Sequence, residues 1–452
     1  MGAVMLSSAG FAAEPVLKDQ GDRYSGAPHA TRSAVLGLNG MAATSQPFAT
    51  QVALDVLKEG GSAVDAAIAA QAVICVVMPQ AAGLGGDMLA LVRTPGGAPA
   101  VGGPGCTPAE PLAAYASDGG SSVTVPGIVD AWSVAHRRFG RLPLAESLAP
   151  AIRIAEDGFA VDPSLHRAAQ QQRKRISRYG AEEWDLLTLP VGAEWRQPEL
   201  AALLRAIAER GAPAFYAGAA AEAVSRAARA HGGALSTRDL ARHRTAESPP
   251  VVVGWGAASL AVQPAPTQGV LLAMAARWID RKADGVDPRA LQHVLVEATE
   301  AAFAHRDESA TRGAALLDEP LDVDVERARN LGGPRAYLHT AGVAVADAEG
   351  TVVSSLVSVF DDFGSGVFVP ELGIVLNNRA GGFTSGPNAP GPGKRPVHTL
   401  APAILSGPRG EALALATPGA DGQVQTLLQV LARLRFDAAA LGDAIAAPRW
   451  RS

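Results

Sequence analysis

The sequence predicts an α+β fold in which antiparallel sheets are covered by helices. Three observations support this prediction. Helical periodicity dominates the chain up to about residue 304, strand signals cluster after residue 340, and the clearest of these signals is a hairpin, which pairs antiparallel strands. Helices and hairpin strands that are segregated along a chain are typical of α+β folds rather than of folds that alternate the two.

Two helices near the N-terminal end are defined by their end signals. The first opens at Pro47 and ends before the glycine pair at 60–61, and Ser62 then caps a second helix over residues 63–78. Because the second helix is almost entirely Ala, Val and Ile, we expect it to be buried on most sides against a sheet. Helical periodicity recurs in five later segments: residues 128–139, 144–157, 198–210, 219–231 and 288–304.

The clearest strand signal is a hairpin in the C-terminal part of the chain. Small and apolar residues alternate over residues 343–346 and 352–360, and the sequence Asp-Ala-Glu-Gly at 347–350 separates the two runs as a tight turn. Shorter strand signals lie at residues 89–92, 251–253, 260–262 and 413–416.

The hairpin turn also predicts which residues face each other. If Gly350 closes a three-residue loop in the left-handed conformation, Asp347 lies opposite Thr351 and, in the same register, Thr340 faces Ser358. Directly opposite residues have Cβ atoms roughly 4.5–5.5 Å apart, so the two hydroxyl groups can meet at the end of the hairpin. The hairpin alone leaves two interpretations open: a nucleophile with a supporting hydroxyl group, or ordinary strand residues.

Bulk composition is that of an ordinary globular enzyme. The 452 residues are 48% hydrophobic and 18% charged, which is sufficient for one large layered core. A net charge of −5 without a basic run argues against nucleic-acid binding, and the longest apolar run, residues 66–78, is too short to span a membrane. The two cysteines, Cys75 and Cys106, cannot build a disulfide framework, and the nine histidines lack ligand spacing, so no metal or other cofactor is implied.

Residues 1–15 contain a mildly apolar stretch that ends in Phe-Ala-Ala-Glu at 11–14, similar to the tail of a secretory signal. The positively charged start of such a signal is missing. Two interpretations stay open: an exported enzyme, periplasmic or secreted, or a cytoplasmic protein with a disordered N-terminal extension.

Six short blocks follow one another along the chain after about residue 22. They are residues 40–47, 60–67, 83–87, 123–127, 267–269 and 363–366. In this order the blocks resemble the gamma-glutamyltranspeptidase family of N-terminal-nucleophile hydrolases. Three further blocks are closer to the oxamate-amidohydrolase-like branch than to glutathione-cleaving members: residues 377–379, 392–400 and 421–425. The resemblance implies a four-layer αββα sandwich.

The resemblance also implies an inactive precursor that cuts its own chain between His339 and Thr340. The cut divides the chain into a signal remnant or extension, a large subunit and a small subunit: residues 1–21, 22–339 and 340–452. Residues 306–338, rich in Asp, Arg and Gly, are expected to form a mobile tail of the large subunit. The two subunits come from one precursor, and the mature enzyme is a possible homodimer.

The implied chemistry is acyl transfer through an acyl-enzyme on Thr340. The freed α-amine, whose unperturbed pKa is about 7.7–8, can accept the hydroxyl proton, and Ser358 supports that hydroxyl group. The family's two-glycine oxyanion turn maps to Gly419 and Ala420, so its second glycine is an alanine. Alanine keeps the N–H donor, but its Cβ restricts the turn if φ must be positive. A plain turn after the preceding strand is the open alternative.

Substrate recognition departs from the family pattern. The arginine that binds the glutamyl carboxylate falls at Cys106, and the acidic pair that binds the α-amine falls at glycines 381–382, so both ends of the amino-acid clamp are missing. Arg379, His398 and Thr399 lie in blocks that line the family's pocket, and Arg379 is a candidate to hold an acidic acyl group. The alternatives are a surface arginine and a structural histidine. We expect Cys106 to be packed rather than reactive, because nothing nearby in sequence lowers its pKa.

We therefore expect an amidohydrolase or acyltransferase that acts on a small amide other than a typical gamma-glutamyl peptide, with water or an amine as acceptor. The alternative is a non-catalytic family member that binds a ligand or serves as a structural partner. The missing clamp and the early end of the chain after Trp450-Arg451-Ser452 motivate this alternative. Self-cleavage before Thr340 is expected of the enzyme, and an intact chain is expected of the non-catalytic family member.

Overall fold

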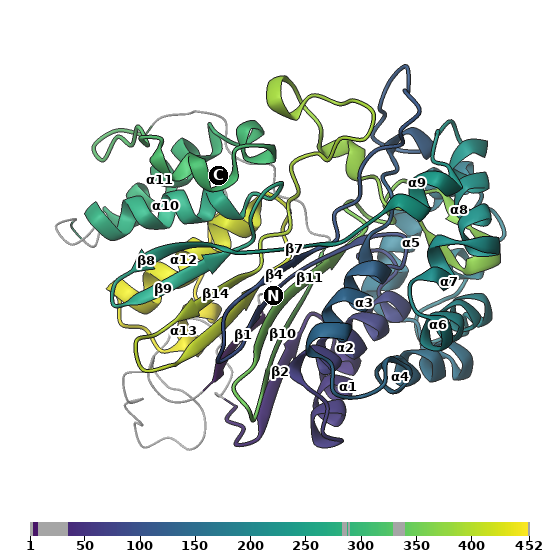
Figure 1. Ribbon diagram of the computed structural model, residues 1–452, viewed down its shortest axis with the longest axis horizontal. Helices are drawn as coiled ribbons and strands as arrows, with labels where there is room; N and C mark the ends of the chain where they lie inside the picture. The colour runs from purple at the N-terminus through teal and green to yellow at the C-terminus, as the bar shows by residue number, and fades with distance from the viewer. Residues whose placement is uncertain (1–2, 8–34, 283–286, 288–289, 329–339, 451–452) are drawn as a thin grey trace.

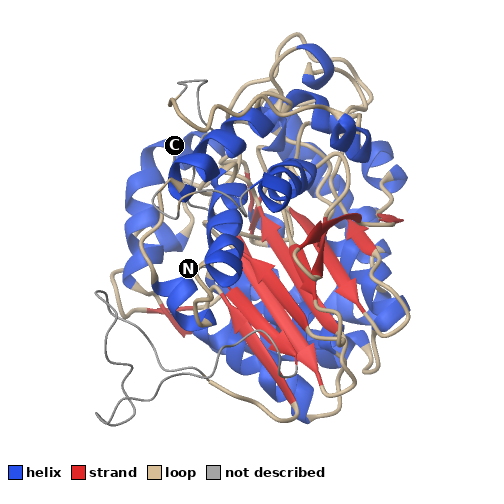
Figure 2. Cartoon of the chain, turned by 90° about the vertical axis from the view of Figure 1, so that its left-hand side faces the viewer, coloured by secondary structure: helices blue, strands red, loops and turns tan. Residues whose placement is uncertain are grey.

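The computed structural model describes residues 3–7, 35–282, 287, 290–328 and 340–450, in which two antiparallel sheets lie face to face between two layers of helices. Figure 1 shows the helices of the N-terminal half outside one sheet and the later helices outside the other. Figure 2, turned by 90°, shows the strands enclosed by helices on both sides. The predicted α+β class and its four-layer αββα arrangement are therefore confirmed.

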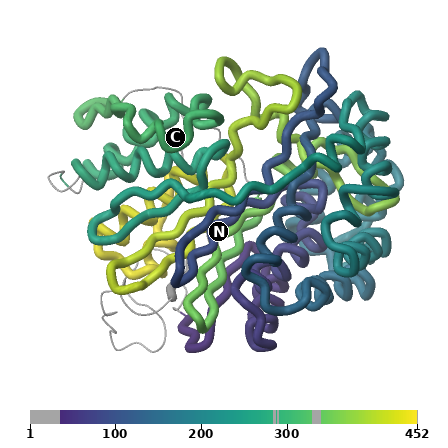
Figure 3. The backbone as a smooth tube through the Cα atoms, viewed as in Figure 1, coloured from purple at the N-terminus to yellow at the C-terminus, as the bar shows by residue number. Residues whose placement is uncertain are grey.

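The first sheet has six strands and contains the hairpin. Its order is β2-β10-β11-β3-β4-β7, and all neighbouring strands are antiparallel. Figure 3 shows the green hairpin of β10 and β11 beside the purple strand β2, so segments far apart in sequence lie side by side. The bounds are β2 (Gly40–Thr44), β3 (Asp87–Arg93), β4 (Ala100–Gly102), β7 (Ala246–Ser248), β10 (Ala341–Asp347) and β11 (Val352–Ser358).

The second sheet has the order β1-β15-β14-β9-β8, with bounds β1 (Ala3–Ser7), β8 (Val251–Trp255), β9 (Ala258–Val262), β14 (Ala403–Ser406) and β15 (Ala412–Ala416). Strand β1 lies in the N-terminal stretch expected to be a signal remnant or extension, and it pairs with β15. Residues 8–34 lie outside the described residues, so the prediction of export stays a prediction. Two short ribbons complete the strands: β5 (Phe159–Ala160) with β6 (Glu194–Trp195), and β12 (Phe368–Val369) with β13 (Ile374–Val375).

The helices of the first layer are α1 (Pro47–Lys58), α2 (Ala63–Val77), α3 (Ile128–Phe139), α4 (Leu144–Asp157), α5 (Pro163–Ile176), α6 (Pro198–Arg210), α7 (Pro213–Tyr216), α8 (Gly218–Ala230) and α9 (Thr237–Arg242). Those of the second layer are α10 (Gly269–Lys282), α11 (Leu291–Phe303), α12 (Gly422–Phe436) and α13 (Leu441–Ala446). Among the described residues, no helix is long and apolar enough to cross a membrane.

Helix α2 is the centre of the first layer. Ser62 and Asp65 form a capping box at its start, and every residue of α2 is buried. Gln71, a polar residue within this apolar helix, donates to Ser355 at 2.6 Å and accepts from Trp132 at 2.7 Å, so its burial is compensated by hydrogen bonds. The predicted burial of this helix against a sheet is confirmed.

The register predicted for the hairpin is confirmed. The N–H of Asp347 donates to the carbonyl of Thr351 at 3.0 Å, Gly350 has φ of +83°, and Ala341 pairs with Val357. Strand β11 ends at Ser358 rather than at residue 360, because Phe360 has φ of +86°, which no strand residue adopts.

The two sheets approach each other closely at the start of the hairpin. Small side chains such as Ala344 and Ala414 fill the space between them, and a Cβ added to Gly342 would lie 3.1 Å from the Cβ of Ala416. The residues that follow β15 are therefore carried to the position just before β10. Thr340 lies at this junction.

The helices and the segment before residue 319 differ in part from the sequence-based expectation. Six helices of the described part of the chain have no counterpart among the predicted ones: α5, α7, α9, α10, α12 and α13. The expectation of a mobile tail is wrong for residues 307–318, which form two 3-10 helices, η5 (Asp307–Ala310) and η6 (Gly313–Asp318), with Ser309 and Leu316 buried. Residues 329–339, including His339, lie outside the described residues.

Candidate active site

Thr340 and Ser358 meet at the end of the hairpin, as their register predicts. Thr340 directly precedes β10 and is 4% exposed, and its Oγ1 lies 3.4 Å from the Oγ of Ser358. The Oγ of Ser358 also accepts a hydrogen bond from the N–H of Phe360 at 2.9 Å. On the other side of β10, Ser45 exchanges two hydrogen bonds with Gly342, at 2.9 and 3.0 Å, which fixes the start of the strand.

A cavity of about 1010 Å³ reaches Thr340 from the side of helices α1 and α5. Its walls include Gln51 of α1, Arg167 of α5, and Pro418, which follows strand β15. Its volume is at the upper end of the range of roughly 300–1,000 Å³ that is usual for ligand sites. Arg379, His398 and Thr399 are not among the residues that line it. The predicted recognition residues therefore lie outside this cavity.

The predicted oxyanion turn leads into helix α12. Ala420 has φ of +49°, so the alanine is held in the left-handed region, at a cost of roughly 1–2 kcal/mol relative to a right-handed conformation. The carbonyl of Gly419 accepts from the N–H of Gly422 at 2.8 Å, and that of Ala420 accepts from Gln423 at 3.1 Å. Because the N–H of a trans peptide points opposite to its C=O, the Ala420 N–H is directed away from the helix.

Gln268 holds this turn from the second layer of helices, and sequence reasoning missed its role. Its Nε2 donates to the carbonyl oxygens of Ala420 at 2.8 Å and of Thr399 at 2.6 Å. The side chain is fully buried, so these hydrogen bonds are protected from water. The Thr-Gln-Gly block at 267–269 was the available signal, although it gives no indication of what the glutamine contacts.

Arg379 is completely buried, so the alternative of a surface arginine is wrong. Its Nη1 donates to Oγ1 of Thr399 at 3.1 Å, its Nε lies 3.5 Å from Oδ2 of Asp87, and its guanidinium stacks 4.4 Å from the ring centroid of Phe360. Its Nη2 has no hydrogen-bond partner among the described residues. Burial lowers the pKa of the guanidinium to about 10, against the attraction of Asp87, so it stays charged at neutral pH.

His398 is a satisfied buried histidine. Its Nε2 lies 3.1 Å from Oδ2 of Asp87, and its Nδ1 accepts from the N–H of Leu400 at 3.3 Å, which places the ring proton on Nε2. Burial and, secondly, the charge of Arg379 lower its pKa to about 4, so it is neutral at physiological pH. Asp87 thus pairs with both side chains, and sequence reasoning did not single it out, although it ends the Gly-Leu-Gly-Gly-Asp block.

The positions of the missing clamp carry no replacement charge of their own. Cys106 is half-buried, and burial raises the pKa of its thiol, with the charge of Arg395 acting in the opposite direction. It is therefore a protonated, packed thiol, as expected. Glycines 381–382 belong to the 3-10 helix η8 (Arg379–Gly382) and offer no carboxylate.

Comparison with known proteins finds the family whose motifs the sequence resembles. A family model described as gamma-glutamyltranspeptidase matches residues 49–452. The oxamate amidohydrolase proenzyme of Klebsiella pneumoniae is 34% identical over 92% of this chain and 86% of its own length. The glutathione hydrolase-like YwrD proenzyme of Bacillus subtilis is 30% identical over 92% and 85%. The crystal structure of cephalosporin acylase from Bacillus halodurans has a TM-score of 0.80 at 30% identity, covering 96% of this chain and 87% of that one.

Proposed function

Since the chain belongs to the gamma-glutamyltranspeptidase family of amidohydrolases and acyltransferases, we propose that Thr340 is its nucleophile and that it acts on a small amide with an acidic acyl group. The observation that supports the nucleophile best is the pairing of Thr340 with Ser358 at the edge of a large cavity. The relatives named as proenzymes support a precursor that is cut into two subunits, here between His339 and Thr340.

In the proposed mechanism the cut gives Thr340 a free α-amine, which takes the proton of its own hydroxyl group. The oxygen attacks the amide carbonyl, and the N–H groups of Gly419 and Ala420 donate to the oxyanion. Collapse breaks the C–N bond, and the amine returns the proton to the leaving nitrogen. Water then attacks the acyl-enzyme and releases the acid, or an amine acceptor takes the acyl group instead.

The substrate proposal rests on the buried guanidinium of Arg379. Its Nη2 is the one guanidinium nitrogen of this side chain for which the described residues supply neither a hydrogen bond nor an ion pair. A buried, charged donor of this kind favours an anionic oxygen, such as the carboxylate of an oxamate-like acyl group. Thr399, which accepts from Nη1, and the neutral His398, which shares Asp87 with Arg379, lie beside this guanidinium. The cavity on the α1 and α5 side leaves room for the departing amine or an acceptor.

A substrate panel tests the proposal. Purified protein is assayed with oxamate, with its uncharged isostere pyruvamide, and with γ-glutamyl-p-nitroanilide. We expect kcat/KM for oxamate to exceed that for pyruvamide by about 10²-fold, because pyruvamide leaves the buried guanidinium without an anion. Turnover of the glutamyl compound above that of oxamate would contradict the argument from Cys106 and glycines 381–382. A possible homodimer and export from the cytoplasm stay predictions.

A further inference from the structure

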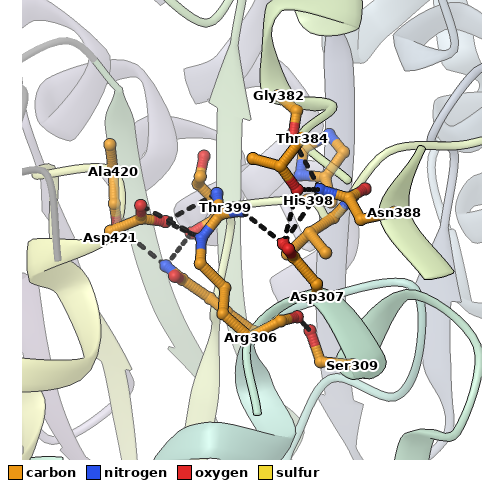
Figure 4. A network of polar contacts seen from close by, with 12 residues as sticks. Arg306, Asp307, Ser309, Gly382, Thr384, Asn388, His398, Thr399, Ala420 and Asp421 are labelled. Carbon is orange, nitrogen blue, oxygen red and sulfur yellow. Dashed lines mark hydrogen bonds and ion pairs between the residues drawn. The ribbon is translucent and has the colours of Figure 1, made fainter. Parts of the chain in front are cut away.

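Two consecutive residues after helix α11 contact both sides of the site from outside it (Figure 4). The guanidinium of Arg306 meets the carboxylate of Asp421 through Nη2 at 3.1 Å and Nε at 3.2 Å. The next residue, Asp307, accepts from Thr384 at 2.6 Å and from Asn388 at 3.3 Å. One short segment of the large subunit is therefore tied both to the turn at 419–421 and to the loop that follows Arg379.

The carboxylate of Asp421 does not serve the helix that it precedes. Asp421 occupies the N-cap position of α12, where an aspartate usually accepts from the first free N–H groups, yet its side chain makes no capping hydrogen bond. It is turned toward Arg306 instead, in the two-point geometry that makes arginine–carboxylate pairs specific in orientation. The ion pair is largely buried, with side-chain exposures of 18% and 9%.

Ala420, which lies between Gly419 and Asp421, has a disfavoured backbone conformation. Ala420 is held at φ of +49°, and a non-glycine residue keeps such a conformation when its surroundings over-determine it. Gln268 fixes the Ala420 carbonyl from one side, and Arg306 fixes the next residue, Asp421, from the other.

We propose that Arg306 is a positioning residue for the oxyanion turn: by holding Asp421, it keeps Ala420 in the left-handed conformation that aims its N–H at the developing oxyanion. This inference rests on the proposed function, since it assigns the turn a role in acyl transfer. Arg306 itself touches no reacting atom. Asp307 links the same segment to the loop that follows Arg379. It does so through Asn388, which also donates to the carbonyl of Gly382 at 2.9 Å.

The test compares Arg306→Met and Arg306→Lys with a matched control, Arg312→Met. Arg312 lies in the same segment and pairs with Glu308 and Glu319, but it is more exposed and does not contact the turn. The readouts are the half-time of self-cleavage, the kcat and KM for oxamate, and the melting temperature. We expect Arg306→Met to lower kcat by about 10²-fold and to leave KM within about threefold of the wild-type value. A misdirected N–H of Ala420 no longer stabilises the oxyanion in the transition state, whereas substrate binding does not depend on it. Arg306→Lys should lose about tenfold.

A double variant separates positioning from general structural support. Adding Ala420→Gly to Arg306→Met should recover about tenfold in kcat, because glycine adopts positive φ without a Cβ penalty. Wild-type kcat in a folded Arg306→Met protein, an equal loss in Arg312→Met, or no recovery by glycine would each overturn the positioning role. A wild-type protein that neither cuts itself nor turns over oxamate would overturn the proposed function instead, and this inference with it.

Discussion

The nucleophile side and the recognition side of the site are built in different ways. Thr340 and Ser358 come from one hairpin, where backbone register brings two hydroxyl groups together. The recognition side joins Asp87, Arg379 and His398, which come from distant segments and are all fully buried. In the proposed function the first side carries the nucleophile that the family resemblance implies, whereas the positions at which that resemblance implies the amino-acid clamp are Cys106 and the glycines 381–382. One side of the proposed site thus depends on local strand register and the other on long-range pairs of buried charges.

The largest effect that separates the two sides is expected from Arg379→Lys. Lysine keeps the charge opposite Asp87 but lacks the fork, so kcat/KM for oxamate should fall by about 10²-fold while self-cleavage before Thr340 proceeds at the wild-type rate. Truncation to alanine is avoided because it leaves the buried Asp87 carboxylate without its positively charged partner. Arg409→Lys, at an exposed arginine paired with Glu411, is the control. Slow self-cleavage in Arg379→Lys would show that the two sides are not separate.

The recognition side should also contribute to the acid sensitivity of the fold, together with His243, whose pKa is likewise lowered by burial. The folded-state pKa of His398, about 4, lies below the unfolded value of 6.5, so the unfolded chain binds more protons between these values. Stability from this group is complete above pH 6.5 and is lost as pH falls toward 4, by at most about 3 kcal/mol. Urea unfolding of the uncut Thr340→Ala precursor at a series of pH values measures this loss, and adding His398→Gln should reduce it, leaving the part that His243 contributes. Equal pH slopes for both proteins would contradict the assignment.

Ser358→Ala probes the nucleophile side. A single neutral hydrogen bond is worth about 0.5–1.5 kcal/mol, so self-cleavage and oxamate turnover should both slow by roughly two- to twelvefold. Ser358→Thr keeps the hydroxyl group and should stay close to the wild type. Time courses on denaturing gels and steady-state rates give the two numbers. A loss of turnover with unchanged self-cleavage would indicate that Ser358 contributes to substrate binding rather than to support of the Thr340 hydroxyl group.

Ala420→Gly is expected to give the smallest change. Glycine relieves the left-handed strain but adds freedom to the unfolded chain, so stability should change by less than about 1 kcal/mol and kcat by less than about threefold. Ala420→Val should instead lose at least about tenfold, because a β-branched residue strongly disfavours positive φ. Thermal melts and oxamate rates test both variants. A large loss on Ala420→Gly would mean that the alanine methyl group itself contacts the substrate.

Local chemistry explains what could be predicted from the sequence. The hairpin register followed from one glycine that needs positive φ, and helix α2 followed from its cap and its continuous apolar run. Helix α12 was missed because Gln423, Gln425 and Gln429 are buried in it and interrupt the apolar periodicity.

Long-range pairs could not be predicted by the same means. Asp87 and His398 are 311 residues apart, and Arg306 and Asp421 are 115 apart, so no local pattern marks either pair. A buried ion pair within loops looks like ordinary polar loop sequence until the fold brings its members together. The exposed-loop interpretation of Arg379 failed for this reason.

The most direct test of the account is the mass of the chains in freshly purified, active protein. Intact-mass spectrometry and N-terminal sequencing should find two chains, the smaller beginning with Thr340, while Thr340→Ala should give one uncut and inactive chain. Full activity in a preparation where Thr340 remains joined to His339 would contradict the proposed nucleophile.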